Sequence, residues 1–200
     1  MNLLTLERLN QPKDNPRSLR HWGSQDPWEA AELVRRHTIG AGVTLPLARI
    51  ADGLVAAVVT WNLPVLHDRL RDGQGPVLYR SVLQDRIVSG RDHLVPSPLW
   101  IEAFITVEPL PKATGTLARL AGMNRAIAAV PQPPGARVWD AFACDYYGFT
   151  VAEVTATSAE VAIQGLREGK APGGGIAHHR RLREEQLFDL AARMNVLPNS

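Results

Sequence analysis

Apolar and polar residues follow one another along this chain in blocks that predict both strands and helices. The densest apolar run, Leu99–Val107, is rich in β-branched and aromatic residues, which is typical of a central strand. Pro109 and Pro111 end this run, because proline cannot donate to a sheet ladder. Thr114 then precedes a stretch of good helix formers, which predicts a helix over Gly115–Val130. We therefore expect a strand, a short loop and a helix at the centre of the fold.

Upstream of this strand, the pattern predicts a helix and a hairpin. The helix Trp28–His37 follows a good capping residue. Two apolar runs, Leu45–Ile50 and Leu54–Trp61, are separated by Asp52 and Gly53, a pair that strongly indicates a tight hairpin. The second run is almost continuous in apolar residues, so we expect that strand to be buried on both faces.

The remaining runs complete a mixed order of elements. The pattern predicts strands at Leu3–Leu9, Arg137–Ala143, Phe149–Val154 and Glu160–Leu166, the last two as an antiparallel pair, a strand and then a helix within Val77–Ile87, and a helix over about Ala177–Met194. This order predicts an α+β fold with a mixed, largely antiparallel central sheet flanked by helices.

We expect one α/β domain over residues 1–169, followed in residues 170–200 by a glycine hinge and a C-terminal helix. The hinge is Lys170–Gly175 (KAPGGG), which has few side chains that could pack. The helix has one apolar face, because four apolar residues recur there at helical spacing. These are Leu187, Leu190, Ala191 and Met194. This face would dock on the chain's own core or on a second copy in a homodimer.

Composition and charge narrow the class of protein. The chain has 200 residues, 45% of them hydrophobic, and a net charge of +2. These values fit a folded domain and do not by themselves indicate nucleic acid or membrane as a partner. Cys144 is the only cysteine, so a cytoplasmic, reducing setting is the simplest expectation. We expect no membrane segment, because no apolar window reaches about 18 residues.

Two residues are candidates for acid–base chemistry. Glu102 lies inside the apolar central strand, where a carboxylate is unfavourable unless it is paired or functional. It could serve as the general base that deprotonates an amine. Tyr147, directly before Gly148, could donate a proton to a departing thiolate. The structural alternatives are an ion pair or a solvent-facing position for Glu102, and a packed aromatic turn for Tyr147.

The strand–helix junction resembles an acetyl-CoA-binding motif. Read from Val107, the sequence V-E-P-L-P-K-A-T-G-T-L-A-R-L is similar to the pattern V-x-P-x-x-[RQ]-x-x-G-x-[GA]-x-x-L of the GCN5-related N-acetyltransferases. The order of the predicted elements over residues 1–155 also resembles this family. Two positions depart from the pattern, since Lys112 stands at the Arg/Gln position and Leu117 at the second small position.

The resemblance implies an acyl-CoA-dependent N-acyltransferase, which transfers an acetyl group from acetyl-CoA to an amine of a small molecule or a protein. The backbone of Ile105 and Val107 would pair with the pantetheine arm of the cofactor. A glycine-containing loop would hold the pyrophosphate, with the helix dipole adding to the attraction. This loop comprises Lys112, Ala113, Thr114, Gly115 and Thr116.

A non-catalytic function is open as well. A basic cluster begins the C-terminal helix: His178, His179, Arg180, Arg181 and Arg183. A binding module could use this cluster to contact a protein partner or nucleic acid. Glu184 and Glu185 follow directly and cancel much of the positive charge, so nucleic acid is the less favoured partner.

Overall fold

The computed structural model of the chain describes residues 17–88, 95–120, 123–131, 144, 146–165 and 177–198. The strands are β1 (Val43–Thr44), β2 (Ala48–Ile50), β3 (Gly53–Trp61), β4 (Leu99–Thr106), β5 (Arg125–Pro131), β6 (Thr150–Val154) and β7 (Ala159–Ile163). The helices are η2 (Arg17–Trp22), α1 (Pro27–Val34), η3 (Arg35–Ile39), α2 (Leu63–Arg71), α3 (Arg80–Val88), α4 (Leu110–Leu120) and α6 (Ala177–Arg193). The strands expected at Leu3–Leu9 and Arg137–Ala143, and the glycine hinge, lie outside the described residues.

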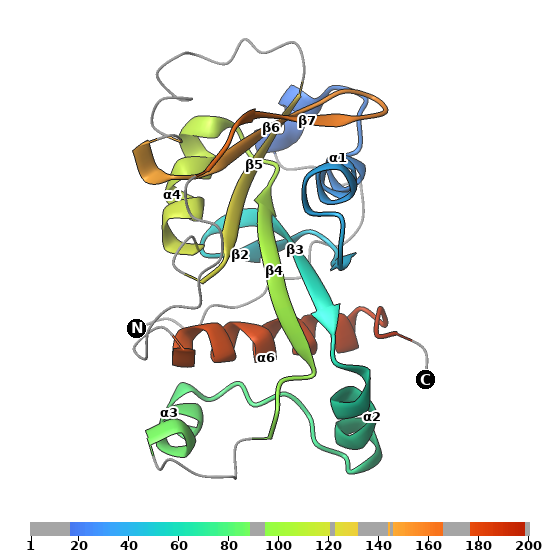
Figure 1. Ribbon diagram of the computed structural model, residues 1–200, viewed down its shortest axis with the longest axis vertical. Coiled ribbons are helices and arrows are strands. Elements are labelled where there is room, and N and C mark those ends of the chain that lie inside the picture. Colours follow the sequence, from blue (N-terminus) through green and yellow to red (C-terminus); the bar gives the residue numbers. More distant parts are fainter. Residues whose placement is uncertain are drawn as a thin grey trace.

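The described strands form one seven-stranded sheet (Figure 1). Their order is β1-β3-β4-β5-β6-β7, and β2 also pairs with β3. β4 is parallel to β5, and β5 is parallel to β6, whereas the other pairs are antiparallel. The expectation of an α+β fold with a mixed, largely antiparallel sheet is therefore confirmed.

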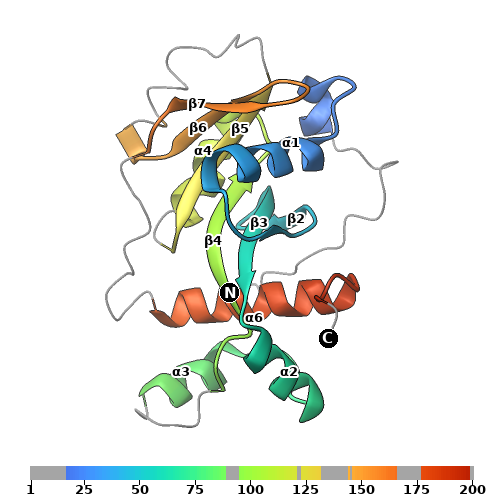
Figure 2. The ribbon, with the colours of Figure 1, turned by 45° about the vertical axis from the view of Figure 1, so that its right-hand side comes forward.

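Helices cover both faces of this sheet. α1 and η2 pack on one face, which we call the α1 face. α6 packs on the opposite face, and α4 lies on that side too, against β5 and β6. β3 contributes alternate residues to the two faces: Leu54, Ala56 and Val58 to the first, and Val55, Ala57 and Val59 to the second. Figures 1 and 2 show α6 crossing the lower ends of β3 and β4, with α2 and α3 beyond it.

The predicted hairpin is confirmed and lies against α4. Ala51 and Asp52 form its turn with φ of 53° and 67°, the mirror-image turn that matches the twist of two antiparallel strands. Gly53 follows, and a Cβ atom there would overlap the side chain of Thr116 on α4. The hairpin and α4 therefore touch at a position that only glycine can occupy without displacement.

The helix predicted over Gly115–Val130 is wrong at both ends. α4 begins at Leu110 and ends at Leu120. Pro111 lies in its first turn, where proline is tolerated because that N–H needs no partner within the helix. The apolar residues that follow belong to β5, whose side chains alternate between the α1 face and α4. A strand buried on both sides has the same apolar composition as a buried helix, which explains the error.

The other expectations hold to different degrees. No strand occurs at residues 77–79, because the N–H of Val77 donates to the Glu185 carboxylate at 2.8 Å instead of joining a sheet. The predicted antiparallel pair is present as β6 and β7. The expected C-terminal helix is α6, which buries Leu187, Leu190 and Ala191 in the core.

Candidate functional site

A β-bulge places Glu102 on the central strand. Val58 of β3 pairs with Ala103 and Val59 pairs with Ile101, so Glu102 is the extra residue with no partner on β3. A bulge of this kind turns two successive side chains to one side. Glu102 thus shares the α1 face with Ala103, whereas Ile101 and Phe104 both face α6. Bulges recur beside active sites because they redirect a side chain in this way.

The carboxylate of Glu102 is held by the neighbouring strand. The Thr60 hydroxyl donates to Oε1 of Glu102 at 2.8 Å, and the described residues give Oε2 no partner. β5 begins opposite Ala103, so among the described residues the part of β4 before the bulge has no parallel neighbour. The Asn124 side-chain amide donates to the Ile101 carbonyl at this point. Glu102 therefore lies where β4 and β5 begin to pair, which makes it accessible along that edge.

The carboxyl end of β4 is held by three side-chain hydrogen bonds. The Thr106 hydroxyl donates to the Leu54 carbonyl at 3.0 Å and accepts from the N–H of Glu108 at 3.3 Å. The Trp22 indole N–H donates to the Val107 carbonyl at 2.7 Å. Trp22 comes from η2, so the segment before α1 covers the end of the central strand on the α1 face.

Glu108 is a buried carboxylate at the beginning of α4. Its exposure is 1%, and the Lys112 ammonium donates to its Oε1 at 2.5 Å. Its Oε2 is buried and has no partner among the described residues. The positive end of the α4 dipole favours a negative charge at this position. Glu108 was not among the site residues expected from the sequence, although its position between an apolar strand and two prolines was a visible signal.

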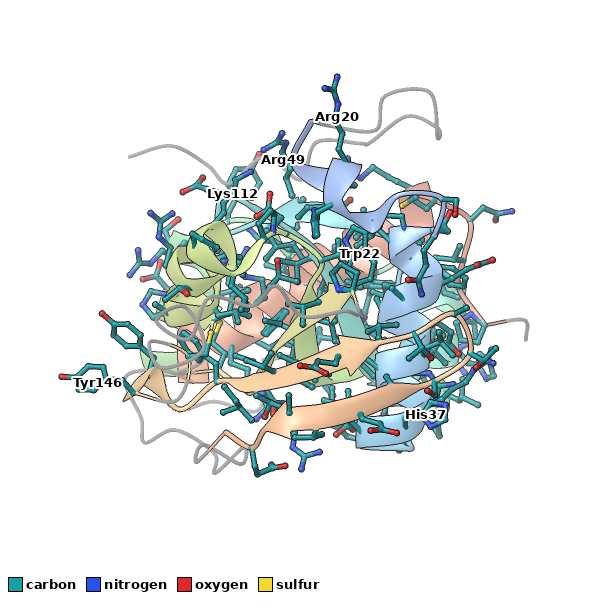
Figure 3. The ribbon with its side chains drawn as sticks, turned by 90° about the horizontal axis from the view of Figure 1, so that it is seen from above. Arg20, Trp22, His37, Arg49, Lys112 and Tyr146 are labelled. Carbon is teal, nitrogen blue, oxygen red and sulfur yellow. The ribbon has the colours of Figure 1, made fainter. Side chains whose placement is uncertain are left out.

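Three cations surround this carboxyl end. Figure 3 shows Arg20, Arg49 and Lys112 along the same edge of the protein seen from above. Arg49 faces Leu54 across the β2–β3 pair, and Arg20 lies two residues before Trp22. Arg20 and Arg49 are exposed and form no ion pair with a described residue. Ligands of open sheets commonly bind at the carboxyl ends of parallel strands, so these charges lie where an anionic ligand would be expected. We call Arg20, Arg49 and Lys112 the basic edge.

The expected pyrophosphate loop is not formed in this structure. Lys112, Ala113, Thr114, Gly115 and Thr116 lie inside α4, because that helix begins at Leu110. A Cβ at Gly115 would meet nothing within 4 Å, so no close approach requires a glycine there.

The expected pairing of the β4 backbone with a pantetheine arm is also not available. Ile105 lies between Ala56 of β3 and Ile127 of β5, so both of its edges are occupied. The carbonyl of Val107 already accepts a hydrogen bond from the indole N–H of Trp22.

Tyr147 and Glu102 are not brought together. Tyr147 is half exposed and stacks on Phe149, with the ring centroids 5.7 Å apart. Phe149 packs with α4 on the side of the sheet opposite the α1 face, whereas Glu102 lies on the α1 face. The sheet therefore separates the two residues, and the packed aromatic turn describes Tyr147 better than the role of a proton donor to a group beside Glu102.

Two arginines of the basic cluster at the start of the C-terminal helix are buried. Arg181 and Arg183 are each only 7% exposed. Glu185 accepts hydrogen bonds from Arg69 at 2.8 and 2.9 Å and from Arg181 at 2.6 Å. Burial lowers the pKa of the Arg181 guanidinium and raises the pKa of Glu184. Arg181 and Arg183 are therefore part of the protein interior, whereas His179 of the same cluster is exposed.

Comparison with known proteins finds no family model, no curated protein and no solved structure that matches this chain. Within the described residues, no helix is both long and apolar enough to span a membrane. The same residues contain no group of three or more His, Cys, Asp or Glu side chains placed to hold a metal ion.

Proposed function

We propose that the chain is an acyl-CoA-dependent N-acyltransferase of the GCN5-related kind. In this proposal the basic edge binds the phosphates of the cofactor, and Glu102 is the general base. The observation that carries it is the placement of these two features on one strand. The basic edge surrounds the carboxyl end of β4, and Glu102 occupies the bulge of the same strand.

The distance along β4 suits a long co-substrate. Glu102 and Glu108 are six positions apart, and a strand rises about 3.3 Å per residue, so the bulge and the carboxyl end are roughly 17–20 Å apart. A ligand that reaches both must carry its phosphates far from its reacting group. Acetyl-CoA does so, because an extended pantetheine arm joins its pyrophosphate to its thioester.

Binding in this position requires Trp22 to leave the Val107 carbonyl. η2 and α1 cover Ala103, Ile105 and Val107 on the α1 face, which is the direct path between the two features. In this proposal the structure corresponds to a closed form, and the cofactor would select a form in which η2 and α1 have moved away from β4. The observed affinity would then be lower than the intrinsic affinity by the fraction of open molecules.

The chemistry assigned to Glu102 is proton removal from the acceptor. Its carboxylate takes a proton from the ammonium group, and the neutral amine attacks the thioester carbonyl. A C–N bond forms, the C–S bond breaks, and the second proton that the attacking nitrogen loses passes through water to the departing thiolate, so that the amide and the free thiol are the products. Thr60 holds the carboxylate in place for this step by donating to Oε1.

Calorimetric titration and thermal unfolding with acetyl-CoA test the proposal. A hundredfold excess over the dissociation constant should stabilise the fold by about 2.7 kcal/mol. Arg49→Gln should weaken binding because it removes one cation of the basic edge, and the effect should shrink as salt screens the charges. Arg71→Gln is the matched control, because Arg71 is an exposed arginine of α2, away from the basic edge.

The variant Trp22→Phe, measured in the same way, tests whether release of the Val107 carbonyl favours binding. It removes the indole N–H that holds the Val107 carbonyl but keeps an aromatic ring in the core. We expect tighter binding of acetyl-CoA together with a lower stability of the free protein. If neither the wild type nor Trp22→Phe binds acetyl-CoA or a longer acyl-CoA, the proposed function is wrong.

A further inference from the structure

An exposed tryptophan lies beside Glu102 on the central strand. Trp100 is 46% exposed, although its neighbours Leu99 and Ile101 are buried. Thr60 is its partner across the β3–β4 pair, and Thr60 also holds the Glu102 carboxylate. Because side chains alternate along a strand, Trp100 and Glu102 both face the α1 side. Thr60, Trp100 and Glu102 thus form one contiguous group at the end of the sheet that α1 leaves uncovered.

This group combines an anion with an aromatic surface. Oε1 of Glu102 is engaged by Thr60, and Oε2 has no partner among the described residues. Arg125 begins β5 beside Ala103 and has a partner of its own. A carboxylate next to an indole is a suitable receptor for an organic cation, because the negative face of the ring and the carboxylate both attract positive charge.

We infer that Trp100 and Glu102 bind a protonated alkylamine, with Thr60 orienting the carboxylate. The ammonium group would donate to Oε2 of Glu102, and the adjacent methylene groups would lie on the indole. An arylamine is uncharged at neutral pH and lacks this methylene chain, so it would bind less well. This inference rests on the proposed function where it names the acceptor, but the binding itself requires no cofactor.

The test is a titration of the full chain with n-hexylamine in the absence of acyl-CoA. The indole N–H signals of protein labelled with nitrogen-15 at tryptophan report binding. n-Hexanol is the neutral control of equal length, and aniline is the aromatic control. We expect saturable binding of hexylamine with movement of the Trp100 signal, and at least tenfold weaker binding of hexanol and aniline.

Three variants locate the site. Glu102→Gln should weaken hexylamine binding by about tenfold or more, because it removes the charge and keeps the shape. Trp100→Leu should weaken it by about fivefold. Trp28→Leu is the matched control, since Trp28 is a similarly exposed tryptophan on α1, and it should leave binding unchanged. Urea unfolding of each variant checks that the fold is intact.

The outcomes separate this inference from the proposed function. Equal affinity for hexylamine and hexanol, or unchanged hexylamine binding in Glu102→Gln, overturns the alkylamine site even when acetyl-CoA binds. Hexylamine binding at Trp100 without any acyl transfer in protein saturated with acetyl-CoA overturns the acyltransferase and leaves the alkylamine site standing.

Discussion

α4 and α6 lie on the same side of the sheet, but they differ in how their charged side chains are buried and paired. α6 turns its charges inward, where Glu185 is fully buried and accepts from Arg69, from Arg181 and from the N–H of Val77. α4 shows its charge to solvent, with Lys112 about half exposed and only one oxygen of the buried Glu108 engaged. Both oxygens of Glu185 are engaged, whereas Oε2 of Glu108 has no partner among the described residues.

This difference separates a structural cluster from a candidate site. A buried charge with all its partners in place fixes the surrounding elements and has no capacity for a ligand. Arg69 also accounts for three otherwise free carbonyls, those of Gln74, Gly75 and Pro96. The cluster therefore ties α2 and the segments that follow it to α6. By contrast, Oε2 of Glu108 has no described partner, and Arg20 and Arg49 of the basic edge form no ion pair with a described residue. A ligand-binding surface needs groups that are available in this way.

The largest decrease in unfolding free energy is expected when the Glu185 side chain is removed. Glu185→Ala leaves Arg69 buried without an anion and leaves Arg181 with Glu184 alone, at 3.7 Å, which should cost about 3–5 kcal/mol of unfolding free energy in urea. The double variant Arg69→Met/Glu185→Leu should recover part of this loss, because apolar residues need no partner. Asp189→Ala is the control on the same helix and should cost less than about 1 kcal/mol, since its pair with Arg193 is partly exposed. A loss below about 1 kcal/mol for Glu185→Ala would contradict the structural role.

α4 depends on close packing instead of buried charge, and Gly53→Ala tests this. The added Cβ would overlap the side chain of Thr116, so α4 or the hairpin must shift. We expect a loss of about 1–3 kcal/mol in urea unfolding. The double variant Gly53→Ala/Thr116→Ala removes both the hydroxyl and the γ-methyl group that the added Cβ would meet and should recover part of it. A neutral Gly53→Ala would mean that the hairpin and α4 are not in contact.

Local residue chemistry explains which parts of the fold could be predicted. Asp52 and Gly53 indicated a hairpin, so the β2–β3 hairpin was predictable, although the two residues of its turn are Ala51 and Asp52. The central strand was predictable because its composition is that of a strand in any context. The start of α4 was not, since the first turn of a helix and an extended segment both tolerate Pro111. The assignment of residues 126–130 to β5 depends on the packing of α1 and α4 on its two sides.

The candidate site was less predictable because its residues meet through long-range contacts. Glu102 was selected as a charge in an apolar strand, but its bulge depends on pairing with β3. Arg20 and Arg49 belong to no sequence motif that indicates a function. Only the fold places them beside the end of β4. The burial of Arg181 on α6 could not be predicted, because Arg69, which it meets through Glu185, is 116 positions from that glutamate in sequence.

A smaller decrease in unfolding free energy is expected for a substitution on the exposed side of α4. Lys112→Met removes the only described partner of the Glu108 carboxylate, and the helix dipole compensates in part. We expect a loss of about 1–2 kcal/mol in urea unfolding. Arg119→Met is the matched control on α4, because the Arg119–Asp52 pair is exposed on both sides and should contribute less than about 0.5 kcal/mol. Equal losses for both variants would show that Glu108 does not depend on Lys112.

The smallest expected change in unfolding free energy is that of Gly115→Ala, and this variant distinguishes a helix from a phosphate loop at residues 112–116. Gly115 lies inside α4, and a Cβ there would meet nothing within 4 Å. Alanine is the better helix former, so Gly115→Ala should raise the unfolding free energy by about 0.5–1 kcal/mol. It should also leave acetyl-CoA binding unchanged, because the basic edge and not the backbone at Gly115 would hold the phosphates. If Gly115→Ala folds normally but loses acetyl-CoA binding, the phosphates approach the backbone at Gly115, and the first turns of α4 must open into a loop when the cofactor binds.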